Sequence, residues 1–373
     1  MEVPMQKRFM TLGSVLFFCL SLWTCPAWSA ETSAIMAAIL DNDPYTLQAA
    51  LKPDVRLDVT DSRGHTPLDV ALMQGNAFSG PVMVNILLRH GARPGSGPAD
   101  PALTLARLLV TQAPLDQLKA ALQTTGRGDA AMPNGLTAFL WAAAFARAPA
   151  VLEALIQAGA NPRQTLPGGD ARLGDNALLL AAEYNENPEI IRFLLRNGLD
   201  VNSRSSLLGD SALMVACRAN RNPAVAEALV RHGANVNLRN GVSFSAFLFA
   251  AGRADGLELL RLLAERGADV RAVDDSLSNA LHVACAGQGS PDVIRFLLSA
   301  GLPVNGQTGK EFGTYSPLMF AVRNANPDAE VIRLLLQRGA DPGLRDMDGR
   351  RAGDGLPAGR VNWLKQNGLA GVL

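Results

Sequence analysis

The sequence predicts an all-α solenoid of about eight helix-turn-helix units, joined by hairpin-like loops and closed by a cap at each end. Two stretches carry the same residue types in the same order: "DSALMVACRANRNPAVAEALVRHGANVN" at 210–237 and "SNALHVACAGQGSPDVIRFLLSAGLPVN" at 278–305. The 373 residues are 48% hydrophobic but only 5% aromatic, which favours short, closely packed helices over a β-sandwich or barrel. Helix start and stop signals recur with the same period, as expected of a repeat architecture.

The first helix of each unit is located by an alanine that follows a short apolar run. This alanine recurs at intervals of 35, 36, 39, 35, 34, 34 and 37 residues, at Ala71, Ala106, Ala142, Ala181, Ala216, Ala250, Ala284 and Ala321. Five residues earlier, all copies but the second (about 97–128) carry an N-cap residue, whose side-chain oxygen accepts the free N–H groups of the first turn. The predicted caps are Thr66, Thr137, Asn176, Ser211, Ser245, Asn279 and Ser316.

A second helix is predicted to begin about 11 residues after the first cap. Its start is marked by a cap residue followed by proline, at Asn187-Pro188, Asn222-Pro223, Ser290-Pro291 and Asn326-Pro327. Its end is marked by a glycine, which readily adopts the left-handed conformation that closes a helix, at Gly91, Gly159, Gly198, Gly233, Gly267, Gly301 and Gly339. Helices this short are marginal alone, so neighbouring units must stack to bury their apolar faces in one continuous core.

These units resemble the ankyrin repeat, whose signature is about 33 residues with T-P-L-H-x-A. The resemblance is carried by "GHTPLDVALMQGN", "ILLRHGARP", "ALVRHGANVN" and "LLLQRGADP". Only Thr66-Pro67 keeps the Thr-Pro pair, and only His282 keeps the histidine. We therefore expect an ankyrin array at 61–345, N-terminal capping helices at 30–60 and a C-terminal cap at 346–373.

The N-terminal 29 residues have the features of a secretory signal peptide. Two basic residues precede an apolar stretch from Phe9 to Trp23, and Ala27 and Ser29 occupy the −3 and −1 positions of a cleavage site. This predicts a mature chain that is periplasmic or secreted. A lipoprotein with a lipidated Cys25 is the alternative. No later segment is apolar for long enough to span a membrane, so no integral membrane segment is expected in the mature chain.

Charge and residue spacing argue against catalysis, metal binding and nucleic-acid binding. Basic and acidic residues both number 34, so no bulk field attracts nucleic acid. Gly209-Asp210-Ser211 resembles a hydrolase nucleophile block, but Ser211 holds the helix-cap slot. His90 and His232 lie four units apart, too far to share a metal, and are expected beside the last carbonyls of their helices. We expect no catalytic residue, no cofactor and no metal.

The resemblance to ankyrin repeats implies a protein partner bound through the loop tips and the face of the first helices, which line the concave side of the array. Carried over position by position, it implies a partner-binding set of Trp141, Phe145, Leu180, Tyr184, Val215, Arg218, Phe249, Arg253, Val283, Phe320 and Arg323. The aliphatic members could equally be packing residues. Trp141, Phe249 and Phe320 are larger than packing requires, and aromatic residues and arginine often dominate interface energies.

Two long loops, 163–175 and 305–315, leave other functions open. Loops project specificity from rigid scaffolds, but repeat arrays also tolerate idle insertions. An enzyme or toxin subunit could carry its site in these loops, where Asp170, Asp175, Lys310 and Glu311 are the available titratable residues. A secreted effector that acts on host proteins is a further alternative. The favoured hypothesis is an exported, non-enzymatic and monomeric scaffold for protein–protein interaction.

The two cysteines outside the signal segment are predicted to stay unpaired. Cys217 and Cys285 are 68 residues apart, which is two repeats. At about 10 Å per stacked layer, their Cα atoms would be about 20 Å apart, whereas a disulfide requires roughly 4.4–6.8 Å. We therefore expect two buried free thiols.

Overall fold

The structure is a computed structural model that describes residues 30–53, 55–74, 79–97, 101–126, 128, 136–165, 176–205 and 208–373. The predicted signal peptide and most of the 163–175 loop lie outside these residues, so the structure does not test them. The chain divides into two compact units. The first comprises the residues up to Trp141 with Gln157–Ala160, and the second comprises Ala142–Ile156 with Asn161–Leu373.

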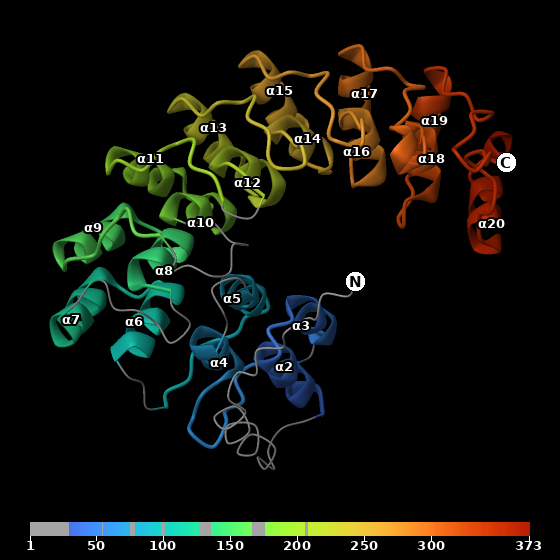
Figure 1. Cartoon of the computed structure of the whole chain (residues 1–373). Helices are drawn as coiled ribbons and strands as arrows, with labels where there is room; N and C mark the ends of the chain where they lie inside the picture. The colour runs from blue at the N-terminus through green and yellow to red at the C-terminus, as the bar shows by residue number, and fades with distance from the viewer. Residues whose placement is uncertain are drawn as a thin grey trace, which may run out of the picture. The chain divides into compact units, whose positions relative to one another are not determined.

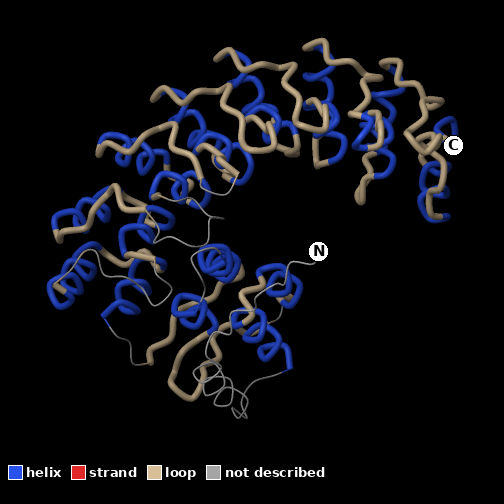
Figure 2. Tube along the Cα trace, viewed as in Figure 1, coloured by secondary structure: helices blue, strands red, loops and turns tan. Residues whose placement is uncertain are grey.

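The described chain is all-α, as predicted, and its secondary structure is helices joined by loops (Figure 2). The first unit contains α2 (Ala30–Leu40), α3 (Pro44–Ala50), α4 (Pro67–Gln74), α5 (Ser79–Arg89), α6 (Pro101–Val110) and α7 (Leu115–Thr125). Helices α8 (Ala138–Phe145) and α9 (Pro149–Gln157) cross the boundary between the units. The second unit continues with α10 (Ala177–Tyr184), α11 (Pro188–Arg196), α12 (Ala212–Ala219), α13 (Pro223–Arg231), α14 (Ala246–Ala251), α15 (Leu257–Glu265), α16 (Ala280–Ala286), α17 (Pro291–Ser299), η1 (Lys310–Phe312), α18 (Pro317–Arg323), α19 (Ala329–Gln337), α20 (Ala358–Gln366) and η2 (Ala370–Val372).

Two rows of stacked helices form the second unit (Figure 1). The first helices of successive repeats, α10, α12, α14, α16 and α18, contact one another in order, and so do the second helices, from α11 to α19. The loops that join one repeat to the next are hairpin-like, with isolated antiparallel bridges such as Arg204–Ser211 and Val273–Asn279. This is the predicted helix-turn-helix stack. The repeat without a cap, at 97–128, also forms a helix pair, α6 and α7.

The first helices begin where the cap residues predicted. Asn176 accepts from the backbone N–H groups of Leu178 and Leu179, at 2.9 and 3.1 Å. Ser211 accepts from Met214 N–H at 3.3 Å, so it caps α12 and does not resemble a free nucleophile. The other predicted caps make the same contact, namely Thr66, Thr137, Ser245, Asn279 and Ser316. Each such cap contributes about 1 kcal/mol to stability.

The second helices confirm two of the four predicted starts in full. Asn187 and Asn222 cap α11 and α13, with proline at the first helical position. Ser290 occupies the N-cap of α17 but makes no side-chain hydrogen bond there. The prediction at Asn326-Pro327 was wrong, because α19 begins at Ala329 and is capped by Asp328, which accepts from Glu330 N–H at 2.7 Å. The carboxylate of Asp328, two residues after Asn326, caps the free N–H groups of the first turn instead.

The predicted helix-closing glycines all adopt the left-handed conformation. Their φ angles lie between 80° and 93°. Two of these glycines follow a histidine that was predicted to lie beside the last carbonyls of its helix, and the structure confirms both predictions. The Nδ1 atoms of His90 and His232 lie 2.9 and 2.8 Å from the carbonyl oxygens of Ile86 and Ala228, at the ends of their helices.

Side-chain amides hold successive repeats of the second unit in register. The Nδ2 atom of Asn220 donates to the carbonyls of Ala182 and Asn185, both at 2.9 Å, in the preceding repeat. Asn185 and Asn324 bind the preceding repeat in the same way. These carbonyls end a helix and lack helical partners, so the amides satisfy groups that would otherwise be buried without a hydrogen bond.

A second set of amides explains why "Val-Asn" recurs in the sequence. Asn237 donates to the Gly267 carbonyl at 2.9 Å and accepts from Asp269 N–H at 2.8 Å. Asn305 repeats both contacts with Gly339 and Asp341 at the same distances. Each asparagine therefore ties its loop to the end of the second helix in the next repeat.

Both described cysteines are buried and free, as the repeat spacing predicted. Burial raises the pKa of the Cys217 thiol to about 12, and burial also raises that of Cys285. The two thiols therefore pack as small apolar side chains in the first-helix row.

Candidate protein-binding surface

Three residues of the predicted partner-binding set belong to the core. Trp141 and Leu180 are each 1% exposed, and Val215 is 5% exposed. A partner cannot reach side chains that the chain itself covers, so the prediction was wrong at these positions. Trp141 was assigned to the surface because of its size, but a large aromatic side chain can be fully buried within a helix stack.

Arg253 is also a structural residue. Its side chain is 14% exposed and occupies the register position that asparagine holds in other repeats. One of its Nη atoms donates to the carbonyls of Cys217 and Asn220, at 3.4 and 2.7 Å, and its other end pairs with Asp255. An arginine that already binds the preceding repeat in this way is not available to a partner, which corrects the prediction for this residue.

The remaining predicted residues, half-buried except for the exposed Arg218, form a surface that we call the first-helix face. It consists of Phe145, Tyr184, Arg218, Phe249, Val283, Phe320 and Arg323. Its aromatic rings are engaged within the chain: Phe145 stacks on Tyr184 at 6.0 Å between centroids, and Phe320 meets Tyr315, of the loop before α18, edge-on at 5.5 Å. These contacts occupy part of the surface that a partner would use.

The arginines of the first-helix face are engaged by neighbouring carboxylates. Arg218 pairs with Asp210 at 2.8 Å, lies 3.9 Å from Glu183 and sits over the Phe249 ring at 5.6 Å. Burial raises the pKa of Glu183, although the Arg218 charge opposes the shift. Arg218 is therefore already engaged by carboxylates and an aromatic ring of its own chain.

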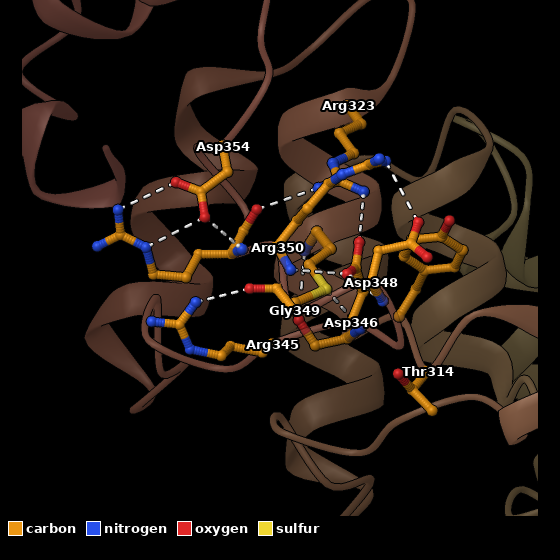
Figure 3. A network of polar contacts seen from close by, with 12 residues as sticks. Thr314, Arg323, Arg345, Asp346, Asp348, Gly349, Arg350 and Asp354 are labelled. Atoms are coloured by element: carbon orange, nitrogen blue, oxygen red, sulfur yellow. Dashed lines mark hydrogen bonds and ion pairs between the residues drawn. The ribbon is translucent and has the colours of Figure 1, made fainter.

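Arg323 belongs to a network of arginines and aspartates at the end of the repeat array (Figure 3). It pairs with Asp346 at 3.3 Å and donates to the Arg351 carbonyl at 3.1 Å. Burial alone would raise the pKa of Asp346, but backbone N–H groups of Arg350 and Asp348 and the Arg323 guanidinium together lower it. Arg351 in turn binds Asp354 at 3.0 Å.

A set of exposed apolar residues, which the sequence reasoning missed, lies on the hairpin-like loops. We call it the fingertip stripe, and its members are 40% to 64% exposed: Leu208, Val242, Leu277, Phe312 and Met347. Apart from Tyr45 in the first unit, these are the exposed large hydrophobic residues of the described chain. They fall on five successive loops. For Leu208, Val242, Leu277 and Phe312, the signal in the sequence was a large apolar residue two to four positions before a helix cap, in a loop where polar residues are expected. Met347 does not show this spacing, because it lies ten positions before Pro357, the N-cap of α20.

Backbone hydrogen bonds bring these loops side by side. Gly241 N–H donates to the Leu208 carbonyl at 2.6 Å, and Asp275 N–H donates to that of Val242 at 3.4 Å. Further along, Gly309 N–H donates to the Ser276 carbonyl at 2.8 Å, and Met347 N–H donates to that of Gly313 at 3.1 Å. The apolar side chains therefore follow one edge of the second unit, one on each loop, where a single extended partner can contact them in turn.

The stacked pairs, the glycine-closed helices and the bonded fingertips agree with a comparison to protein families. A family model described as ankyrin repeats (3 copies) matches residues 139–240 and 247–346, more than half of the chain. The chain belongs to the ankyrin-repeat family. A search of curated proteins found no matching relative.

The ankyrin assignment gives a coarse function, which is that of a protein–protein interaction scaffold. Ankyrin repeats are typically non-enzymatic. The two matched segments contain Leu208, Leu277 and Phe312 of the fingertip stripe and the whole first-helix face from Phe145 to Arg323. In the described part of the chain, no helix is both long and apolar enough to cross a membrane.

Proposed function

We propose that this ankyrin-repeat protein is an exported scaffold that binds a protein partner through its fingertip stripe. The observation that carries the proposal is the presence of exposed apolar side chains on five successive, hydrogen-bonded loops. Covering apolar surface contributes about 25 cal/mol per Å², so a partner laid along the loops would gain at every repeat. The first-helix face lies beside these loops and supplies half-buried Phe249, Val283 and Phe320 as secondary contacts.

The proposed location is the periplasm or the exterior of the cell, and the proposed state is a monomer. Support comes from the charged start, apolar core and cleavage site within residues 1–29. Sequencing the N-terminus of the mature protein should find Ala30 or Glu31. A protein that keeps Met1 in the cytoplasm would disprove export, and a lipid on Cys25 would indicate the lipoprotein alternative.

The binding surface is tested with a triple variant, Val242→Ser, Leu277→Ser and Phe312→Ser. Affinity purification from the exported fraction, followed by mass spectrometry, should recover a partner with the wild-type chain and lose it with the variant. The matched control changes exposed residues of the second helices, Arg196→Ser, Arg231→Ser and Gln337→Ser. If both variants retain the partner, the stripe is not the binding surface.

A further inference from the structure

A cavity of about 630 Å³ lies at the C-terminal end of the second unit. It is bounded by the end of α18, by the loop that precedes α20 and by the first turn of α20. Arg323, Arg350 and Arg360 line it, together with Val322, Leu356 and Pro357. We call it the arginine pocket. Its volume falls within the range of about 300–1,000 Å³ that is usual for ligand sites.

The pocket carries more positive charge than its neighbours neutralise. Five arginines and three aspartates make up the local network, which leaves an excess of two positive charges. Asp354, the carboxylate in the wall, is already bound by Arg351. Arg350 pairs with Asp348 at 3.3 Å, but both side chains are more than half exposed, so this pair contributes little.

Arg360 supplies a charge that has no carboxylate partner among the described residues. Its guanidinium donates to the carbonyls of Val322 and Asn324, at 2.9 and 2.6 Å, and to that of Ala325 at 3.2 Å. Carbonyl oxygens satisfy its N–H groups but leave its charge uncompensated. Helix α20 starts in the same wall, and its N-cap Pro357 provides no side-chain hydrogen bond, so the positive end of that helix adds to the field.

The lining selects a carboxylate attached to an apolar group. Guanidinium groups bind carboxylates through two parallel hydrogen bonds, and the exposed Arg350 is the lining arginine that can do so. Arg323 and Arg360 contribute charge, because their N–H groups are already bound. Val322, Leu356 and Pro357 provide an apolar wall beside them. Asp346, Asp348 and Asp354 lie in the same network and would repel an extended polyanion. The chain as a whole is neutral, with 34 basic and 34 acidic residues, which also disfavours nucleic acid.

The position of the pocket connects it with the fingertip stripe. Met347, the last residue of the stripe, and Arg350 lie on one loop, which is closed by a hydrogen bond from Asp346 N–H to the Arg350 carbonyl at 2.9 Å. A segment that covers Met347 can therefore place its next side chain near Arg350. This favours an internal acidic side chain over a chain terminus.

We propose that the arginine pocket binds a Glu or Asp side chain of the partner, carried next to an apolar residue on an extended segment. The proposal rests on the proposed function, because the carboxylate belongs to the protein that the fingertip stripe binds. It adds the chemistry of that partner, which is apolar residues along the stripe followed by an acidic one at its C-terminal end.

The test measures fluorescence polarisation of a labelled peptide, Leu-Glu-Leu-Glu with both ends blocked, on the full chain at low salt. We expect saturable binding that is at least fivefold weaker for the Arg350→Gln variant and for a Leu-Gln-Leu-Gln peptide. The matched control is Arg338→Gln, which removes an exposed arginine outside the pocket and should bind as the wild type does. Raising the salt concentration should weaken binding.

Four outcomes would overturn the proposal. These are equal binding of the Glu and Gln peptides, unchanged binding by Arg350→Gln, displacement of the peptide by an equal concentration of inorganic phosphate, and binding only of a Gln peptide with a free C-terminal carboxylate. The Val242, Leu277 and Phe312 triple variant should still bind the blocked Glu peptide. Loss of partner capture by that variant with intact peptide binding supports both proposals, whereas retained capture by that variant overturns the proposed function alone.

Discussion

The first-helix face and the fingertip stripe belong to the same repeats, but the rest of the chain contacts the side chains of the first and leaves those of the second exposed. On the first-helix face, aromatic rings pack against each other and arginines pair with aspartates, as Arg218 does with Asp210. On the fingertips, backbone groups are bonded from loop to loop while the apolar side chains remain exposed. Residue type alone therefore does not identify a binding residue in this protein. What matters is whether the folded chain already contacts that side chain.

The largest expected effect is on the rate at which the cysteines are alkylated. Cys217 is buried on α12, although its neighbour Arg218 is exposed. A pKa of about 12 instead of 9 makes the thiolate of Cys217 about 1,000-fold rarer at neutral pH, and burial also blocks access. Both Cys217 and Cys285 should resist iodoacetamide in the native chain. Both should react in denaturant without a reducing agent, as mass spectrometry will show. A requirement for prior reduction would indicate a disulfide and contradict the repeat register.

The next largest effect concerns stability. Trp141→Ala should lower the free energy of unfolding by about 3–5 kcal/mol, because it leaves a cavity where a fully buried indole was. Urea denaturation followed by circular dichroism at 222 nm measures the change. Phe312→Ala, which truncates an exposed aromatic residue, is the control and should shift the midpoint little. If the Trp141→Ala chain is as stable as the wild type but no longer binds its partner, Trp141 contributes to the binding surface and not to the core.

A smaller effect depends on pH and arises at His282, on the buried side of the first-helix face. Its Nδ1 accepts from Asn279 N–H at 3.2 Å, and its Nε2 lies 3.0 Å from the Gly306 carbonyl. Burial lowers the pKa of His282 below 6.5, so the folded state favours the neutral ring. Its contribution is complete above pH 6.5 and is lost progressively as the pH falls below that value toward the folded pKa. The melting temperature should fall between pH 7.5 and 5.5, and the His282→Gln variant should show a smaller fall. Equal pH dependence of the two chains would contradict this assignment.

The smallest expected effect is on the stability of fingertip variants. Met347→Ser changes a side chain that is 64% exposed, so the free energy of unfolding should move by less than about 0.5 kcal/mol. Partner binding should nevertheless weaken. Thermal melting and affinity capture on the same preparation check the two halves of this prediction. A large loss of stability would show that the fingertips hold the loops together through their side chains.

The repeat pattern predicted most of the fold because its signals are local. A cap such as Asn176 satisfies N–H groups two and three residues away, and a glycine such as Gly233 closes a helix through its own φ angle of 88°. Neither depends on distant parts of the chain. The one incorrect helix start arose from a local competition as well, between Asn326 and Asp328.

The candidate site was harder to predict because burial depends on neighbours in the stack. Leu180, Val215 and Phe249 hold the same slot in successive repeats, yet only Phe249 is half-exposed. Arg253 and Arg218 are both arginines near the end of a first helix, but one binds carbonyls of the preceding repeat and the other pairs with Asp210. Those partners lie up to 36 residues away in the chain.

The sequence by itself determined the helix pairs, their caps and their glycine ends, the stacking period and the isolation of Cys217 from Cys285. Only the tertiary structure decided that Trp141 is core, that Arg253 holds the repeat register and that Leu277 and Met347 are exposed. It also decided that Arg323, Arg350 and Arg360 surround one pocket. Hydrogen bonds at helix ends form between near neighbours and can be read along the chain. Exposure and charge balance are sums over residues that only folding brings together.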